Sequence, residues 1–419
     1  MRDVRTERMS QRVRTREPQR AQSVIRFEAP EDALPVDHPA RLLWRIVGTL
    51  DVQPFLANAR AIEGRQGRDV LSARMLLTMW LYAISEGIGS GREIERRLKT
   101  DAAFQWIVGD REVGRTKLNE FRVDHGEALD QIFTDVIGVL MHKGVLSLDL
   151  VAQDGTRVRA SASAPSFRRA ESLEACREQA QLHLRVVLAS DEDESEKRHR
   201  AVREAKAKEL AERIDNAISM VRELRARGVG GKKPRASTTD PQARVMKMGD
   251  GGFRPAYNVQ LATAGDADGG PRTIVGVRVS NVGSDMGSIS PMLDDIEKRC
   301  GALPSILLAD SNHASFSDLR DAAARGVTAL VSVPERSKGG GEQASQDPVI
   351  EEWRRHMQTE EAKQTMRARS SLCELSNAHA KTRFAMASVL LRGLDKVTCL
   401  ALWTALAANM LAHAATLLS

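Results

Sequence analysis

The sequence predicts an α/β protein: a mixed sheet with helices on its faces, interrupted by an all-helical insertion and preceded by a helical region. Strands that alternate with helices are the first observation, because such an order builds a sheet covered by helices. The second is the charged helical stretch 166–228 after the first strand, and the third is the helical periodicity of 38–145. The predicted strands are short alternating or apolar segments at 146–154, 256–263, 273–280, 305–310 and 327–333.

The segment 27–145 is predicted to be a helical DNA-binding domain. Several short helices are joined by turns that contain glycine, a pattern typical of helix-turn-helix-type domains and of generic helical bundles. Within it, Ser90 and Thr116 are predicted to cap helices. The preceding segment 1–26 carries eight arginines and few apolar residues. We expect a disordered basic arm there, which either contacts phosphates or is simply a poorly ordered terminus.

The strands define an α/β domain over 146–383, with the helical insertion at about 166–235. The insertion is rich in charge and poor in apolar residues at heptad spacing, which predicts a solvated helical hairpin. Residues 336–348 are rich in Gly, Ser and Gln and are predicted to form a flexible loop. The C-terminal helices, 384–419, are predicted to pack on the core.

Composition argues against several classes of protein. Lys and Arg number 62 against 56 Asp and Glu, and this excess of +6 permits a nucleic-acid partner without proving one. The four cysteines lie far apart, which argues against zinc fingers and disulfide frameworks. The apolar stretch 397–418 is interrupted by Thr404, Asn409 and His413. It is therefore predicted to be a buried helix, and we expect no membrane partner.

Two aspartates are candidates for chemistry because each ends a predicted strand. Asp154 is followed by Gly155, and Asp310 is followed by Ser311 and Asn312. In open α/β sheets, ligands bind where strand ends open into loops. Two carboxylates brought together there repel each other, and a divalent cation such as Mg²⁺ relieves the repulsion. Each aspartate taken singly is better explained as a turn cap, but the pair in this strand order indicates phosphoryl transfer.

A third acid would complete such a site, and Glu374 is the candidate. Lys381 follows seven residues later, on the same face of a predicted helix. The carboxylate could then bind the metal while the lysine holds a phosphate as a point charge. Spacing alone favours the alternative, in which Glu374 is a surface acid on an amphipathic helix.

Several phrases in a fixed order over roughly 27–415 carry a resemblance to a known family. They are FEAP at 27–30, PARL at 39–42, DGTRVRASAS at 154–163, TDPQAR at 239–244, YNVQ at 257–260, LADSN at 308–312 and RGLDKV at 392–397, together with Asn409. The chain resembles bacterial insertion-sequence transposases of the DDE type, close to the IS1182 group within the wider IS4/IS5-like set. The resemblance implies an RNase H-like catalytic core with an all-helical insertion.

The same resemblance implies a DDE triad of Asp154, Asp310 and Glu374, with Mg²⁺ as the cofactor and Mn²⁺ as its substitute. Relatives usually carry a tyrosine and then an arginine before the glutamate, and an aromatic–glycine pair after it. In this chain Met366 stands at the tyrosine position, and Arg369 can serve as the arginine. Leu-Ser-Asn-Ala replaces the residues that usually follow the glutamate, while the lysine at position 381 is retained.

Basic residues near these motifs are candidates for contacts with DNA phosphates, which fix the register of a protein on a duplex. Surface salt links and a solvated linker are the alternative explanations. The candidates are Arg115, Lys117, Arg122, Arg157, Arg159, Lys232, Lys233 and Lys381.

The predicted function is DNA transposition, in which metal-dependent cleavage at the element's ends is followed by strand transfer into target DNA. The partners would be double-stranded DNA, as terminal inverted repeats and as target, and further copies of the chain, because two ends must be synapsed. The expected location is the bacterial cytoplasm, in association with the nucleoid. Two alternatives stay open: an inactive DNA-binding relic of such a transposase, and an RNase H-fold nuclease without strand transfer.

Overall fold

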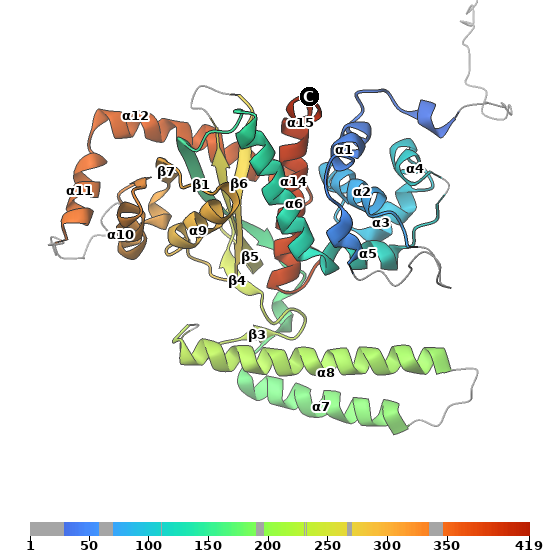
Figure 1. The fold of residues 1–419 in the computed structure, drawn as a ribbon. Helices are drawn as coiled ribbons and strands as arrows, with labels where there is room; N and C mark the ends of the chain where they lie inside the picture. Colours follow the sequence, from blue (N-terminus) through green and yellow to red (C-terminus); the bar gives the residue numbers. More distant parts are fainter. Residues whose placement is uncertain are drawn as a thin grey trace, which may run out of the picture.

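The computed structural model describes residues 29–57, 70–109, 111–189, 197–229, 231, 233–265, 270–334 and 347–419. The expected basic arm, 1–26, lies outside these residues, and so does most of the expected loop 336–348. A central sheet, a group of N-terminal helices and a protruding helical hairpin make up the described part of the chain (Figure 1).

The N-terminal part is helical, as predicted. Its helices are α1 Pro39–Val47, α2 Ala73–Ser85, α3 Gly91–Arg97, α4 Ala102–Val108, α5 Arg115–Asp124 and α6 Gly126–His142, with 3-10 turns at Pro30–Ala33 and Gln53–Leu56. Helix α2 begins at a cap in which the Ser72 hydroxyl accepts from the Met75 amide at 3.3 Å. The predicted cap at Thr116 is wrong, because α5 already begins at Arg115. Ser90 stands at the N-cap position of α3 without a side-chain capping bond.

The sheet combines antiparallel and parallel pairs. Its strands are β1 Leu150–Arg159, β4 Arg244–Lys247, β5 Phe253–Ala264, β6 Thr273–Ser280, β7 Ile306–Ala309 and β8 Thr328–Val331, in the order β4-β5-β1-β7-β8, with β6 also paired to β5. Strand β5 runs antiparallel to β1, β4 and β6, whereas β1, β7 and β8 are mutually parallel neighbours. The sequence analysis did not predict the short strand β4. The other five strands correspond to predicted segments.

Helices cover both faces of this sheet. Packed against its strands and against one another are α9 Ile289–Cys300, α10 Phe316–Ala324, α11 Pro348–His356, α12 Glu360–Arg369, a π-helical turn Ser370–Glu374, α13 Leu375–Thr382, α14 Leu394–Ala412 and α15 Ala414–Leu418. Helices α9 and α14 pack on β6. On the opposite face, the small apolar cluster that includes Ala152, Leu308 and Leu372 joins the sheet to α12 and the π-helical turn. This second face carries the site described below.

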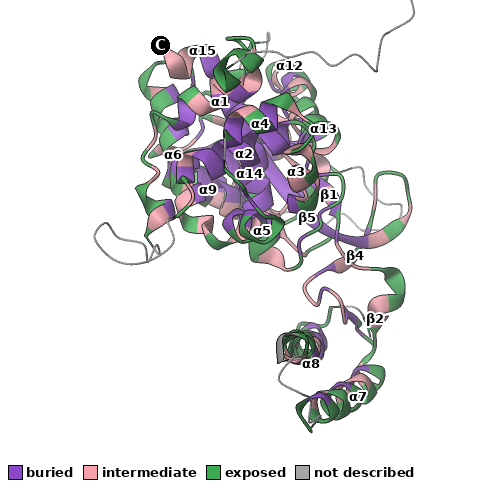
Figure 2. Cartoon of the chain, turned by 90° about the vertical axis from the view of Figure 1, so that its right-hand side faces the viewer, coloured by how far each residue is buried: buried purple, intermediate pink, exposed green. Residues whose placement is uncertain are grey.

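Helix α14 is central to the packing of the whole body. It contacts α2, α6 and β6, and its side chains join those of the N-terminal helices and the sheet in one continuous hydrophobic cluster. Figure 2 shows α2 and α14 as the most continuously buried helices. Among the described residues, α14 is long and apolar enough to cross a membrane by length and composition, but 67% of its apolar stretch is buried inside the protein. It is therefore a core helix, as predicted.

The predicted helical insertion forms a hairpin that projects from the body. Helices α7 Ala170–Ala189 and α8 Lys197–Ala226 pack along each other, and the two-residue strands β2 Phe167–Arg168 and β3 Ala236–Ser237 pair at its base. A small apolar cluster of its own holds the hairpin together, and most of its surface is exposed (Figure 2).

Candidate active site

The register of the sheet brings the two predicted aspartates to the same level. Strands β1 and β7 pair in parallel as far as Ala152, which lies opposite Leu308. Asp154 and Asp310 each lie two residues beyond that pair. Because side chains alternate along a strand, Asp154 points to the same face as Ala152, the face covered by the π-helical turn.

Asp310 directly follows β7, as predicted, whereas the prediction that Asp154 ends a strand is wrong. Strand β1 continues to Arg159 because β5 is 12 residues long and pairs with β1 along this whole stretch. The parallel neighbour β7 ends at Ala309. Asp154 therefore lies within the β1–β5 pairing but beyond the last residue pair between β1 and β7.

Asp310 is held firmly by its own turn. Its carboxylate accepts from the Asn312 backbone amide at 3.0 Å and from Asn312 Nδ2 at 2.9 Å. His313 Nδ1 lies 2.6 Å from Asp310 Oδ1, the oxygen that also accepts from the Asn312 backbone amide. Burial raises the pKa of Asp310, but the hydrogen bonds from His313 and Asn312 outweigh burial and bring that pKa below its usual value.

Asp154 shows the opposite shift. Burial raises its pKa, and the negative charge of Asp310 raises it further, while the positive charge of Arg369 and a hydrogen bond from Asn377 partly offset these effects. The net pKa of Asp154 lies above its usual value. Two carboxylates whose environments shift their pKa values apart are a common feature of functional sites.

The structure adds a residue that the sequence analysis did not single out. Asn377, on α13, donates from Nδ2 to Asp154 Oδ2 at 2.9 Å and is only 8% exposed. Its Oδ1 is buried and has no hydrogen-bond partner among the described residues. No pattern in the sequence singles it out, because Asn377 follows Glu374 by three residues and helical spacing alone would place both on a similar face.

Glu374, the predicted third acid, is exposed at the end of the π-helical turn, and its carboxylate accepts a hydrogen bond from the Ser370 hydroxyl. Among the described residues, no group of three His, Cys, Asp or Glu side chains is arranged to hold a metal ion. Lys381 is half-buried near Asp154. Burial lowers the pKa of its ammonium group, the positive charge of Arg157 lowers it further, and Asp154 partly restores it.

A buried polar network lies under the site, on the opposite face of β1. Asp285 accepts from Arg157 at 2.9 Å, from Asn258 Nδ2 at 2.7 Å and from Gln260 Nε2 at 2.6 Å. Gln260 Oε1 in turn lies 3.1 Å from Nε2 of His313, the residue that contacts Asp310. Asp285 and His313 are both buried. The alternation along β5 could have indicated that Asn258 and Gln260 share a face.

Gly155 leaves room for this network, so a methyl group at position 155 is expected to destabilise the folded protein. A Cβ there would lie 2.2 Å from Gln260 Nε2 and 2.5 Å from Asp285 Oδ1. We expect Gly155→Ala to lower the free energy of unfolding by roughly 1–3 kcal/mol, measured by chemical denaturation. Gly138→Ala is the matched control, because it meets nothing within 4 Å on an exposed helical position and should be neutral or stabilising. Equal stability of the two variants would contradict this account of the network.

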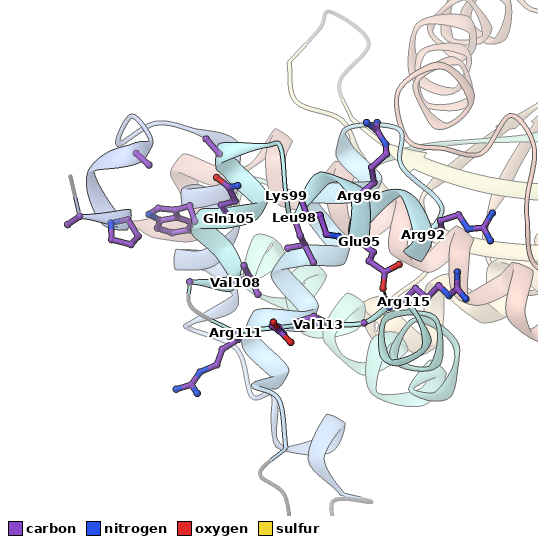
Figure 3. Close-up of a pocket in the computed structure, with 18 residues that line it drawn as sticks. Arg92, Glu95, Arg96, Leu98, Lys99, Gln105, Val108, Arg111, Val113 and Arg115 are labelled. Carbon is purple, nitrogen blue, oxygen red and sulfur yellow. Dashed lines mark hydrogen bonds between the residues drawn. The ribbon is translucent and has the colours of Figure 1, made fainter. Parts of the chain in front are cut away.

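The predicted DNA contacts on α5 fall into two groups. Arg115 and Lys117 are exposed, and Arg115 lines a cavity of about 1220 Å³ among the N-terminal helices (Figure 3). The basic side chains around this cavity outnumber the acidic ones and are Arg92, Arg96, Lys99, Arg111 and Arg115. Arg122 is instead buried: its guanidinium lies over the Trp80 ring at 4.8 Å, and burial lowers its pKa to about 10. Because it faces the core, Arg122 has no surface to offer to a phosphate.

The remaining basic candidates are spread over the catalytic part. Arg157 forms the ion pair with Asp285 described above, whereas Arg159 is exposed at the end of β1. Lys233 is exposed near the base of the helical hairpin, and Lys232 lies outside the described residues.

Comparison with protein families identifies two segments of the chain. A family model described as a transposase domain matches residues 28–124, and a model described as a transposase DDE domain matches residues 226–410. The chain belongs to the DDE transposases of insertion sequences. No curated protein and no solved structure matched the chain.

The two matched segments cover different parts of this transposase. The first covers most of the N-terminal helices, and the second includes Asp310, Glu374 and Asn377 but begins after Asp154. It is the sheet that places Asp154 beside the second segment, because β1 lies between β5 and β7.

Proposed function

We propose that this transposase cleaves DNA at the terminal inverted repeats of its insertion sequence and joins the freed ends to target DNA. The observation that carries the proposal is the juxtaposition of Asp154 and Asp310 at one edge of the β1–β7 pair, where the pKa of Asp154 is raised and the pKa of Asp310 is lowered. The strand order, with β5 antiparallel to β1 and with β7 and β8 parallel to it, supports an RNase H-like core. The motif order supports an IS1182-like subgroup.

The donor chemistry at the site fits a divalent cation, with Mg²⁺ as the proposed ion and Mn²⁺ as its substitute. Two carboxylates and the buried amide oxygen of Asn377 are hard oxygen donors of the kind that Mg²⁺ prefers. Asp154 and Asp310 would hold the ion, and Glu374 is the proposed third acid. A bound divalent cation supplies Lewis acidity for phosphoryl transfer. Lys381, half-buried near Asp154, would hold a phosphate of the cleaved strand.

The N-terminal helices are the proposed DNA-binding domain. Arg115 and Lys117 on α5 would contact phosphates of the inverted repeat, and the basic cavity that Arg115 lines supports this assignment. Arg159, Lys232 and Lys233 are proposed to contact the DNA backbone near the catalytic part. We further propose a homo-oligomer on DNA, because two ends are joined in one reaction, and a cytoplasmic location with the nucleoid.

One observation favours a second candidate function, an inactive DNA-binding relic. Glu374 is exposed and its carboxylate accepts a hydrogen bond from Ser370, and among the described residues no three His, Cys, Asp or Glu side chains are grouped to hold a metal. A relic would keep the basic helical part and bind the repeats without cutting them.

The test is a cleavage assay on a labelled duplex that carries the inverted repeat flanking the gene, with a target plasmid and Mg²⁺. We expect the wild type to nick at the repeat's end and to join that end to the plasmid. Glu374→Gln should lower the nicking rate at least about 100-fold if the third carboxylate stabilises charge in the transition state. Glu361→Gln, an exposed glutamate on α12, is the matched control and should cut like the wild type.

Each other outcome identifies a different error. Normal cutting by Glu374→Gln would show that Glu374 is not the third acid. Binding of the repeat without any cutting would support the relic. Nicking without joining would support a nuclease that lacks strand transfer.

A further inference from the structure

Asn377 occupies an unusual position for an amide side chain. One end is satisfied, because Nδ2 donates to Asp154 Oδ2 at 2.9 Å. The other end is not, because Oδ1 is fully buried and receives no hydrogen bond within the described residues. Buried side-chain oxygens are usually partnered, so an unpartnered oxygen beside the Asp154 carboxylate calls for a hydrogen-bond donor or a cation.

The surroundings of Asn377 identify the kind of partner. The amide touches Asp154, whose carboxylate is electrostatically coupled to Asp310. Two carboxylates and one amide oxygen form a set of hard oxygen donors with a net negative charge. Such a set suits Mg²⁺ or Mn²⁺, which bind carboxylate and Asn carbonyl oxygens, far better than it suits an anion or an apolar group.

The local helix geometry explains why Asn377 rather than Glu374 faces the site. The π-helical turn ends at Glu374, and α13 begins with the next residue, Leu375. This turn packs against β1 and β5, and α13 continues along the same strands. Glu374 stays exposed with its carboxylate on Ser370, while Asn377, one turn later, is directed onto β1. Additional residues in a helical turn commonly mark a functional site.

We propose that Asn377 is an oxygen ligand of the divalent cation at this site and binds it through Oδ1, together with Asp154 and Asp310. This inference rests on the proposed metal-dependent function. It separates two roles: Asn377 contributes to metal affinity in the DNA-free protein, whereas Glu374 contributes to cleavage.

The first experiment measures Mn²⁺ binding to the full-length, DNA-free protein by titration calorimetry. We expect Asn377→Leu, which keeps a similar volume, to weaken Mn²⁺ binding at least about tenfold. Asn377→Asp should bind Mn²⁺ at least as tightly as the wild type, because it keeps an oxygen donor and adds a negative charge. Ser376→Ala is the matched control and should stay close to wild-type affinity. Circular dichroism of the metal-free variants verifies that they are folded.

The second experiment tests direct ligation. A thiolate at position 377 should bind Cd²⁺, a soft ion, and produce the ultraviolet absorption of a Cd–thiolate bond in Asn377→Cys. Ser376→Cys, one residue earlier on α13, is the matched control, and the wild type gives the background of the four native cysteines. The proposal requires an absorption in Asn377→Cys that exceeds both.

The outcomes separate this inference from the proposed function. Wild-type affinity in Asn377→Leu, or equal Cd²⁺ signals in the two cysteine variants, would overturn the role of Asn377. If Asp310→Asn abolishes Mn²⁺ binding in the same series, the metal site itself still stands. If Mn²⁺ binding to the wild type is absent or insensitive to Asp310→Asn, both the metal site and the role of Asn377 are wrong.

Discussion

Asp154→Asn is expected to lower Mg²⁺-dependent nicking roughly 1000-fold or more, and to make the metal-free protein more stable than the wild type at pH 7. The nicking rate falls because the site loses a ligand of the proposed metal ion. Such an ion gives several kcal/mol of charge stabilisation in phosphoryl transfer, and about 4 kcal/mol corresponds to about three orders of magnitude in rate. The measurements are the nicking rate on the labelled repeat and the melting temperature without metal.

The stability effect follows from the pKa of Asp154. Its pKa is raised in the folded protein, by burial first and then by Asp310, so the folded state favours the protonated form. The carboxylate therefore costs stability as the pH rises from the unfolded value of 3.8 through the folded value. Asparagine avoids that cost and keeps an oxygen that can accept from Asn377.

The pH dependence gives this prediction its control. The stability difference between Asp154→Asn and the wild type should be present at pH 7 and should vanish well below pH 3.8, where the aspartate is protonated in both states. Asp149→Asn, an exposed residue just before β1, should change neither nicking nor stability. If Asp154→Asn is less stable than the wild type at pH 7, the carboxylate stabilises the fold. The idea that it is kept for catalysis at a cost in stability would then be wrong.

Trp403→Ala is expected to lower the free energy of unfolding by about 3–5 kcal/mol, the largest stability effect we predict. Trp403 is 1% exposed on α14, and its indole Nε1 donates to the Arg122 carbonyl at 3.0 Å. The substitution would leave a cavity where α14 meets the N-terminal helices and would leave that carbonyl without its donor. Chemical denaturation, followed by far-ultraviolet circular dichroism, measures the change.

Two control variants separate the cavity from other effects. Trp403→Phe keeps most of the ring but loses the donor, so we expect a smaller loss than in the alanine variant. Lys396→Ala, on the exposed side of the same helix, should stay within about 0.5 kcal/mol of the wild type. Because one hydrophobic cluster joins the N-terminal helices, α14 and the sheet, Trp403→Ala should weaken both parts together. Unfolding of the N-terminal helices alone would show that the two parts are energetically separate.

The element order was predictable from the sequence because it depends on local patterns. The predicted strand segments 256–263, 273–280, 305–310 and 327–333 correspond to β5, β6, β7 and β8. Asp310 was found for the same reason, since the apolar run before it ends where β7 ends. The charged periodicity of 166–228 likewise predicted the projecting hairpin, because too few apolar residues were available to bury it in the body.

Long-range contacts determined the features that local patterns missed. Asp154 lies in mid-strand because β5, about a hundred residues later, extends the pairing. Arg122 was predicted to contact DNA from its charge and helical position, but it is buried over Trp80. Hydrophobic periodicity shows which face of a helix is apolar, but it does not show that a neighbouring element will cover a charged residue.

The sequence by itself determined the family and the order of the elements, and it singled out Asp154 and Asp310 as candidates, because these depend on residue type and on spacing within one element. Only the tertiary structure decided that Asn377 contacts Asp154 while Glu374 remains exposed. That outcome depends on how the π-helical turn is seated on β1 and β5. Glu374 and Asn377 are only three residues apart and have similar helical spacing, so only packing against another part of the chain selects which of them reaches the site.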